Sequence, residues 1–318
     1  METLIIMLKN VIIFVLLAVP GYLLVKSHLL KSNESGGLSK LLTYVGMPFL
    51  ILSSTLNLEF SGSFTVSLVL CGIFGFAFTL IMFGITALLV RDKTNEKRRG
   101  VARFCMIFSN NGFIGIPLAR AIFGDGSAVM AYLIILNIVT NVLLFTVGIY
   151  LISGDKKAIS LKKALLSPVL IAFVAGLILN FAGINRFLPE AQTYATYFSN
   201  IVTPLSMTIL GMKLASIALK RLFTSWRMYY VSAARLLLFP VLAVCLLFAL
   251  RLVPALTLPN EAILACFIAF AMPTAGLASA FADQFGGDTE NAVIFTLGAT
   301  ILSVATIPVL YWLLRTLI

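Results

Sequence analysis

Long apolar segments, separated by short polar connections, recur from one end of the chain to the other. A helix needs about 18 or more largely apolar residues to cross a hydrocarbon core of about 30 Å, and ten segments meet this length. They predict an all-α polytopic membrane protein with ten transmembrane helices. The predicted helices are residues 3–24, 38–57, 64–90, 101–123, 127–152, 166–183, 194–216, 228–251, 261–284 and 291–314.

The fourth predicted helix contains a cluster of residues that a smooth helix does not favour. Pro117 lacks the N–H that its turn needs, Gly112 and Gly115 add backbone freedom, and Asn110 and Asn111 can compete for backbone partners. Freed backbone groups in a bilayer are tolerated only where protein surrounds them or water reaches them. The cluster therefore indicates a broken helix with a substrate or ion site at mid-depth. An ordinary proline kink is the alternative.

Composition supports the membrane assignment. Of the 318 residues, 60% are hydrophobic and 11% are charged, whereas charged residues make up about a quarter of a soluble domain. The net charge of +11 does not indicate a nucleic-acid partner, because the basic residues lie in the connections between apolar segments. The lipid bilayer is the expected surrounding.

Most Lys and Arg residues lie in the odd-numbered connections. Positively charged connections stay in the cytoplasm, so we expect both termini to be extracytoplasmic, in a bacterial-type inner membrane. The ninth connection carries Asp288 and Glu290 instead, but acidic residues have little weight in this rule. The basic residues of the first, third, fifth and seventh connections are Lys26, Lys31, Lys40, Arg91, Lys93, Lys97, Arg98, Arg99, Arg103, Lys156, Lys157, Lys162, Lys163, Lys213, Lys220, Arg221 and Arg227.

Metal and disulfide chemistry are not expected. The four cysteines lie in apolar segments without metal-ligand spacing, and the only histidine, His28, has no evident ligand partners. We therefore expect no metal and no cofactor. The cysteines are Cys71, Cys105, Cys245 and Cys266.

Two proline pairs indicate an internal repeat. Pro48 and Pro204 are separated by 156 positions, and so are Pro117 and Pro273. Two pairs at one offset are harder to attribute to chance than one. Both broken segments also end in Phe-Gly followed by an aspartate, namely Phe123-Gly124-Asp125 and Phe285-Gly286-Gly287-Asp288.

An odd number of helices in each copy would give the two copies opposite orientations, as in many secondary transporters. We therefore expect a 5+5 inverted repeat with broken, crossing helices 4 and 9. Residues 1–152 form the first repeat, residues 153–165 a short cytoplasmic linker and residues 166–318 the second repeat.

The fourth helix resembles the signature of a known family. Residues Asn110-Asn111-Gly112-Phe113-Ile114-Gly115-Ile116-Pro117-Leu118, with Phe123-Gly124-Asp125 after them, are similar to the fourth-helix motif of the auxin efflux carrier family. That family includes the PIN-FORMED carriers of plants and many bacterial relatives. Ala271-Met272-Pro273-Thr274-Ala275 is similar, more loosely, to the second crossover of the family. The long central loop of the plant carriers is absent.

The resemblance implies that the helices form two domains with different roles. Helices 1, 2, 6 and 7 would form a scaffold domain, and helices 3–5 and 8–10 a transport domain. The substrate would bind near the crossing of helices 4 and 9, and elevator-like motion of one domain would expose it to either side. Related carriers make a homodimer the expected assembly.

The candidate ligands are neutral hydrogen-bonding groups, because a transport site must bind its substrate and also release it. Asn110 and Asn111 offer amide N–H groups to a carboxylate, and half-helix N-termini beside them would add partial positive charge. The resemblance implies that a first-crossover Asn binds substrate, without deciding between the two. Asn137 and Asn141, one turn apart, line the cavity or make interhelical hydrogen bonds.

Further candidates follow from the repeat. Ser53, Ser54 and Ser206 lie at similar distances after related prolines and are candidate scaffold contacts, although hydroxyls bonded to their own helix are the more frequent case. The full set of candidate substrate-binding residues is Asn110, Asn111, Gly112, Pro117, Asn137, Asn141, Ser53, Ser54, Ser206, Pro273 and Thr274.

Few charges lie within the apolar segments. Asp283, with Gln284 beside it, could take a proton or Na⁺, or be a solvated residue at a helix end, which we favour. Arg235 could snorkel to the cytoplasmic interface or attract an anion. Without an evident carboxylate cage, Na⁺ coupling has little support.

The leading hypothesis is a secondary transporter of small organic anions, such as carboxylates that are auxin-like or dicarboxylic. A channel or membrane sensor on the same scaffold is the alternative. An enzyme is not expected, because no Ser/His pair, paired intramembrane aspartates or His-Glu-x-x-His motif stands in the apolar segments, and no Walker motif is present.

Overall fold

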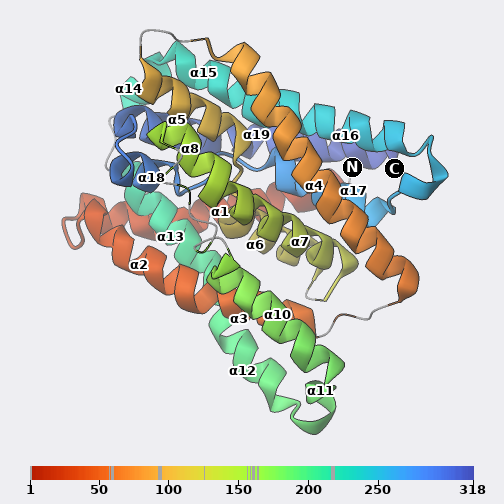
Figure 1. The fold of residues 1–318 in the computed structure, drawn as a ribbon. Helices are drawn as coiled ribbons and strands as arrows, with labels where there is room; N and C mark the ends of the chain where they lie inside the picture. The colour runs from red at the N-terminus through yellow and green to blue at the C-terminus, as the bar shows by residue number, and fades with distance from the viewer. Residues whose placement is uncertain are drawn as a thin grey trace. The chain divides into compact units, whose positions relative to one another are not determined.

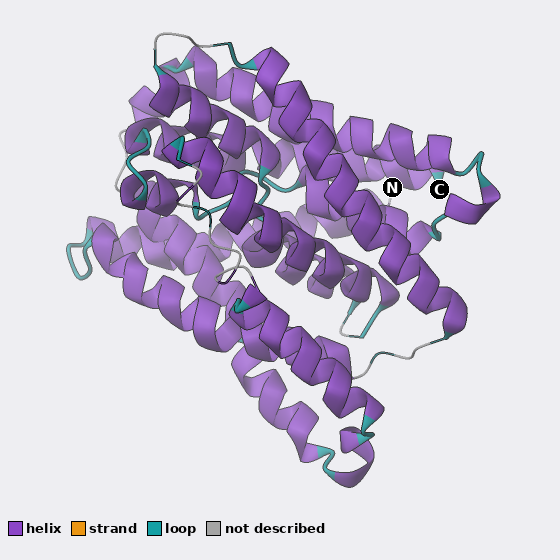
Figure 2. Cartoon of the chain, viewed as in Figure 1, coloured by secondary structure: helices purple, strands orange, loops and turns teal. Residues whose placement is uncertain are grey.

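A computed structural model describes residues 2–318, except 57, 59–60, 92–94, 125, 156, 158, 160–161, 163–164 and 216–218. Asp125 of the first Phe-Gly-acid ending and the loop residues Lys93, Lys156 and Lys163 therefore lie outside the described residues. The regular structure of the described part is helical (Figure 2), with one isolated β-bridge. The chain divides into two compact units, each built from segments that are distant in sequence.

The first unit comprises Met1–Phe60, Gly112–Ala131 and Leu166–Leu219. Within it, α1 packs along α13, and α10 and α12 both pack against α3 (Figure 1). Its helices are α1 (Glu2–Lys26), η1 (Ser32–Glu34), α2 (Ser35–Leu41), η2 (Leu42–Gly46), α3 (Met47–Leu56), α6 (Ile116–Phe123), α10 (Pro168–Phe181), α11 (Ile184–Phe187), α12 (Glu190–Ser199) and α13 (Val202–Ala215).

Glycines allow the backbones of α1 and α13 to touch. A Cβ at Gly21 would lie 1.9 Å from the carbonyl oxygen of Thr208, and a Cβ at Gly211 would lie 1.9 Å from that of Ala18. Each helix therefore needs a residue without a side chain where the other crosses it. This is the small-residue packing typical of helices in membranes, where close backbone approach replaces the hydrophobic driving force.

A single amide satisfies the C-terminal end of α3. The Asn180 side chain, from α10, has two N–H donors, and its nitrogen lies 2.9–3.0 Å from the carbonyl oxygens of Thr55, Leu56 and Leu58, so that one hydrogen is shared between two of them. The last carbonyls of a helix have no partner within the helix, and in an apolar environment each unpaired group costs free energy. Asn180 therefore stabilises the end of α3 inside the first unit.

The second unit comprises Ser61–Asn111, Tyr132–Leu165 and Lys220–Ile318. Within it, α19 packs against α5, α15 and α18, and α17 packs against α4 and α16 (Figure 1). Its helices are α4 (Gly62–Leu89), α5 (Glu96–Ile107), α7 (Ala128–Leu143), η4 (Leu144–Gly148), α8 (Ile149–Ser153), α15 (Trp226–Ala233), η6 (Ala234–Leu238), α16 (Phe239–Leu250), η7 (Pro254–Leu256), α17 (Asn260–Ala271), α18 (Ala278–Gln284) and α19 (Thr289–Leu317). Three described elements cross the division: the first four residues of α7 and all but Asn111 of the short η3 (Asn111–Gly115) belong to the first unit, and so does Leu219, the first residue of α14 (Leu219–Thr224).

Close packing also holds the second unit together. A Cβ at Gly100 would lie 1.9 Å from the carbonyl oxygen of Leu151, so α5 and α8 meet backbone to backbone. The rings of Phe78 and Phe270 pack edge to face, with centroids 4.7 Å apart. Nearby, the free thiols of Cys71 and Cys266 are in contact, with Sγ atoms 3.7 Å apart.

Three widened helical turns precede prolines. The π-helical turns η2, η3 and η6 end two residues before Pro48, Pro117 and Pro240, respectively. A proline has no N–H to donate, and its ring clashes with the preceding turn. A π-helical turn relieves this clash by widening the helix locally. These prolines therefore shape turns within helical segments rather than ending them.

The longer helices lie in the segments that the hydrophobic pattern predicts, whereas the short η1, α11, α14 and η7 lie in predicted connections. The predicted continuous helix over 194–216 is wrong, because α12 ends at Ser199 and α13 begins at Val202. Pro204, in the first turn of α13, accounts for this turn, because in a continuous helix its ring would clash with the carbonyl of Asn200 and it has no N–H to donate to it. Five described helical stretches are long and apolar enough to cross a membrane, and shorter apolar stretches are Leu16–Lys26 of α1, Asn111–Phe123, Pro168–Phe181 and Asn260–Ala271. The five are Ser32–Leu56, Gly62–Leu89, Ala128–Ser153, Trp226–Leu250 and Thr289–Leu317.

Candidate substrate site at two helix interruptions

Two interruptions in helices meet inside the second unit. The first follows α5, where residues 108–110 leave the helix before η3 begins at Asn111. The second follows α17, which ends at Ala271, and α18 begins only at Ala278. Met272 is extended, with ψ 150°, because a residue before a proline is pushed out of the helical region. Pro273 thus ends α17.

The two interruptions run antiparallel and pair through their backbones. Ser109 and Thr274 form an isolated antiparallel bridge. The Asn110 N–H donates to the carbonyl oxygen of Pro273 at 2.7 Å, and the Ala275 N–H donates to that of Phe108 at 2.8 Å. Backbone groups released from each helix are therefore satisfied by the other interruption, as a non-aqueous environment requires.

Two hydroxyl groups complete this pairing in a reciprocal way. Ser109 Oγ, beyond the end of α5, donates to the carbonyl oxygen of Ala269 at 2.6 Å, near the end of α17. Thr274 Oγ1, beyond the end of α17, donates to the carbonyl oxygen of Cys105 at 2.9 Å, near the end of α5. Each helix end is therefore capped by a side chain that follows the other helix.

Arg235 satisfies further carbonyls at both helix ends. Its guanidinium donates to the carbonyl oxygens of Met106 and Ile107 at 3.0 and 2.7 Å, and also to that of Phe270. The side chain is fully buried. It lies in η6, the π-helical turn before Pro240. The expectation that Arg235 snorkels to the cytoplasmic interface or attracts an anion directly is wrong, because the carbonyls of the interruptions occupy it.

The positive charge of Arg235 is offset by the partial negative charges of two helix C-termini. Each helix C-terminus carries roughly half a negative elementary charge, and α5 and α17 both end at this guanidinium. The two ends together offset about one positive charge. Arg235 therefore removes a negative potential that would otherwise disfavour an anion at the interruptions.

The Asn111 amide is part of a buried network with α7. The Asn137 side chain donates to Asn111 Oδ1 at 2.8 Å, and Asn111 Nδ2 donates to Thr140 Oγ1 at 3.2 Å. Asn141 Nδ2 in turn donates to Asn137 Oδ1 at 3.0 Å and to the Asn137 carbonyl at 2.9 Å. Asn111 and Asn137 are buried, and Asn141 is partly exposed. The sequence leaves two roles open for Asn137, lining the cavity or hydrogen bonding between helices. In the structure its side chain makes a hydrogen bond between segments.

The side chain of Asn110, unlike that of Asn111, is not part of this hydrogen-bond network. Its side chain is partly exposed, and it makes no hydrogen bond to any other residue that the structure describes. Its backbone is held by Pro273. A fixed backbone with an available amide is the arrangement expected of a ligand group.

Five other candidate residues belong to the first unit, and four of them are buried. Ser53 Oγ donates to the Leu50 carbonyl at 3.0 Å, and Ser206 Oγ to the Thr203 carbonyl at 3.0 Å, so both hydroxyls bond within their own helices. The buried Ser54 hydroxyl has no partner among the described residues. Pro117 lies in the first turn of α6, which follows η3. It is seven residues beyond Asn110, where the first interruption ends. Gly112, within η3, is partly exposed.

The candidate ion-coupling residues lie away from the paired interruptions. Asp283 and Gln284 are exposed at the last turn of α18, which is the location of a solvated residue at a helix end. Within the part of the chain that the structure describes, no three His, Cys, Asp or Glu side chains are grouped to hold a metal ion.

Sequence reasoning missed Ser109 and gave Arg235 the wrong role. Both were visible as polar residues within apolar segments, a placement that commonly marks the interior of a helix bundle. Their partners could not be read from the sequence, because Ser109 bonds to a carbonyl 160 positions later. Asn110, Pro273 and Thr274 are brought together as backbone partners at the interruptions.

Comparison with known proteins adds independent information. Residues 5–311 match the family described as membrane transport protein. The chain is 28% identical over 306 residues to an uncharacterized transporter from Methanothermobacter thermautotrophicus, with 94% of each chain covered. It is 30% identical over 224 residues to an uncharacterized transporter from Methanocaldococcus jannaschii, covering 66% of this chain and 70% of that one.

Proposed function

Because this chain belongs to the membrane transport protein family, which is the auxin efflux carrier family, we propose that it is a secondary transporter of small organic anions. The family consists of integral membrane transporters rather than enzymes. Our proposal adds the substrate class, a carboxylate such as an auxin-like acid or a dicarboxylate, and the mechanism of alternating access.

The observation that carries the substrate class is the state of the Asn110 amide. It is partly exposed at the point where a helix resumes, and its Nδ2 has two hydrogens to donate. A hydrogen bond to a charged group contributes about 1.5–3 kcal/mol net. That is enough for selective binding and small enough to permit release.

The electrostatics around Asn110 favour an anion over a cation. The helical segment that starts at Asn111 presents a positive N-terminus, and the negative ends of α5 and α17 are offset by Arg235. None of the hydrogen bonds at the interruptions, among the described residues, involves an Asp or Glu side chain. An approaching carboxylate therefore meets donors and little negative charge.

The division of the chain into two units supports an elevator-type mechanism. The first unit groups Met1–Phe60 with Leu166–Leu219, and the second groups Ser61–Asn111 with Lys220–Ile318. Apart from Gly112–Ala131, which belongs to the first unit without a counterpart from the second half, this grouping joins corresponding parts of the two sequence halves, as an inverted 5+5 repeat of ten membrane helices would. We propose that the first unit is the scaffold and that the second unit, with the paired interruptions, carries the substrate.

Counterflow in proteoliposomes tests this function and separates a carrier from a channel. A thermal-shift screen of carboxylates, with and without Na⁺, first selects the substrate for the full-length protein. Vesicles preloaded with that unlabelled carboxylate should then accumulate the labelled form faster than empty vesicles, with saturable kinetics. A channel would show no stimulation from the opposite side. Failure of every carboxylate to shift the melting temperature and to exchange would refute the proposal.

A further inference from the structure

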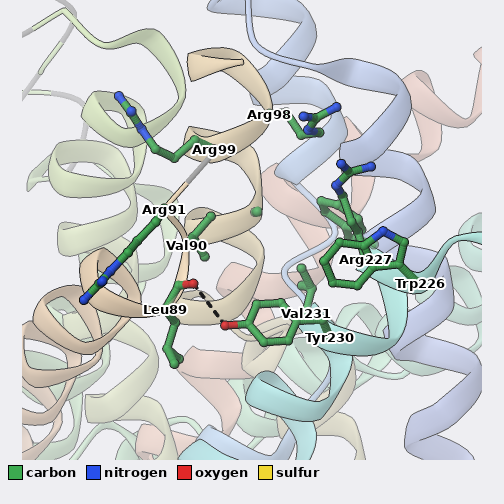
Figure 3. A pocket seen from close by; sticks show the side chains of 11 residues that line it. Leu89, Val90, Arg91, Arg98, Arg99, Trp226, Arg227, Tyr230 and Val231 are labelled. Atoms are coloured by element: carbon green, nitrogen blue, oxygen red, sulfur yellow. Dashed lines mark hydrogen bonds between the residues drawn. The ribbon is translucent and has the colours of Figure 1, made fainter. Parts of the chain in front are cut away.

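A second polar site lies in the second unit, apart from the helix interruptions. It is a pocket of about 260 Å³ formed by the end of α4, the start of α5, the start of α15 and one residue of α19 (Figure 3). It shares no residue with the hydrogen-bond network around Asn110 and Asn111. Four arginines line it, namely Arg91, Arg98, Arg99 and Arg227.

Local hydrogen bonds build the walls of this pocket. The Tyr230 hydroxyl donates to the Leu89 carbonyl at 3.1 Å, which ties α15 to the end of α4. The side chain of Asn95 caps α5 by accepting from the Arg98 N–H at 2.9 Å. Two helix N-termini, those of α5 and α15, therefore begin at the pocket, and each adds partial positive charge.

Among the residues that the structure describes, those lining the pocket carry a strongly positive charge. Arg99 forms an ion pair of 3.0 Å with Glu96, whose side chain is 81% exposed. Even with this carboxylate counted, the described residues of the pocket carry three positive charges in excess. In Figure 3, the guanidiniums of Arg98 and Arg227 lie on the same side of the pocket, whereas those of Arg91 and Arg99 extend away from them on the other side. Arg98 and Arg227, which come from two different helices, are therefore the guanidiniums best placed to contact an anion in the pocket.

The rest of the lining is apolar and aromatic. Val90, Ala102, Val231 and Phe295 contribute aliphatic and ring surface, and the Trp226 ring lies beside the Arg227 guanidinium at 5.3 Å. Tryptophan and tyrosine with arginine are typical of the membrane interface, where one end of a ligand is apolar and the other is charged.

We propose that this pocket binds the phosphate group of an organic phosphate, with the apolar part of the ligand against Trp226. Guanidinium groups match phosphate oxygens in geometry as well as charge. Basic pockets between membrane helices on the cytoplasmic side bind anionic headgroups, and these arginines belong to connections that the charge pattern predicts to be cytoplasmic. Occupancy would join α4, α5 and α15 and stabilise the second unit. A phospholipid and a soluble phosphate ester share this chemistry.

Tryptophan fluorescence can test this proposal directly. The sequence has two tryptophans, so Trp312→Phe leaves Trp226 as the only reporter in the full-length, detergent-purified protein. Dioctanoyl phosphatidic acid should produce a saturable change, whereas dioctanoylglycerol, which lacks the phosphate, should not. A matching response to glycerol 3-phosphate identifies a soluble ligand, and its absence identifies a lipid. An equal response to dioctanoylglycerol, or no response to either phosphate probe, overturns the proposal.

Variants distinguish the pocket from general charge attraction. Arg98→Gln combined with Arg227→Gln should weaken the binding of the responding phosphate probe by about tenfold or more, since each guanidinium–phosphate contact is charge-assisted. Arg315→Gln, at an exposed position of α19, makes a similar charge change outside the pocket and should leave binding unchanged. If the double variant does not give monodisperse protein, the exposed Arg227→Gln alone should weaken binding by about threefold. Equal weakening by Arg315→Gln, or unchanged binding in the pocket variants, would refute the assignment.

Discussion

The guanidinium of Arg235 donates a hydrogen bond of 2.7 Å to the carbonyl oxygen of Ile107, the last residue of α5. The same side chain reaches the Phe270 carbonyl near the end of α17. One buried cation therefore joins the ends of two helices that are far apart in sequence. Its loss would leave carbonyls from both helices without a donor.

Arg235→Met should destabilise the protein by about 3 kcal/mol or more, because it removes one partner of several buried, charge-assisted hydrogen bonds. Arg235→Lys keeps the charge but lacks the planar fork of donors, so its loss should be intermediate. Thermal unfolding of the purified variants, followed by tryptophan fluorescence, measures both. Arg315→Met, at an exposed position, is the control. A melting temperature for Arg235→Met equal to that of the control would contradict the capping role.

The reciprocal hydroxyl caps predict a matched pair of effects. Ser109→Ala and Thr274→Val should each cost about 1–3 kcal/mol, since each leaves a carbonyl at a helix end unpaired. Ser303→Ala and Thr79→Val are controls, because these buried hydroxyls bond only to carbonyls of their own helices. Both controls should cost less. Thermal unfolding of the four variants measures these losses of stability. Equal losses in the test and control variants would argue against capping.

Asn111 and Asn137 should be energetically coupled. The hydrogen bond between them is buried, so removing either amide leaves the other without its partner. Asn111→Ala and Asn137→Ala should each destabilise the protein, and the double variant should cost less than the sum by about 0.5–3 kcal/mol. A double-mutant cycle on thermal stability measures this coupling. Additive effects would mean that the amides act independently.

Asn180→Ala should destabilise the first unit and leave the hydrogen bonds of the two helix interruptions unchanged. It removes the two N–H donors that reach three carbonyl oxygens at the end of α3, and we expect a loss of about 2 kcal/mol or more. Asn33→Ala, at an exposed position in η1, removes the same amide and should change little. Limited proteolysis and thermal melts of both variants provide the comparison. Similar behaviour of the two would show that Asn180 does not stabilise α3.

Much of the fold could be predicted, because apolar length determines where membrane-type helices lie. Helices α4 and α19 occupy nearly the residues that the pattern gives for them. The turn after Ser199 is not predicted by the apolar pattern, although Pro204, four residues after Asn200, is the residue that disfavours a continuous helix there. Pro117 was assigned to the interruption, yet it lies beyond η3, because a π-helical turn accommodates it. The period of the pattern does not report such widened turns.

The candidate site was predictable by residue type and less so by role. Two adjacent asparagines at a helix interruption indicated a polar site, but only the structure separates the engaged amide of Asn111 from that of Asn110. The registration of Ser109 against Ala269 depends on how two segments pack. Local sequence cannot supply that information, because contacts between distant segments are set by the whole fold.

The central claim is that the Asn110 amide receives a carboxylate. Counterflow of the selected carboxylate in proteoliposomes, compared per amount of folded protein, tests it through two substitutions. Asn110→Ala removes the donor and should lower the apparent affinity by about tenfold or more, and Asn110→Asp should lower it further, because a carboxylate there repels the substrate. Exchange by Asn110→Asp at the wild-type rate and affinity would contradict the account.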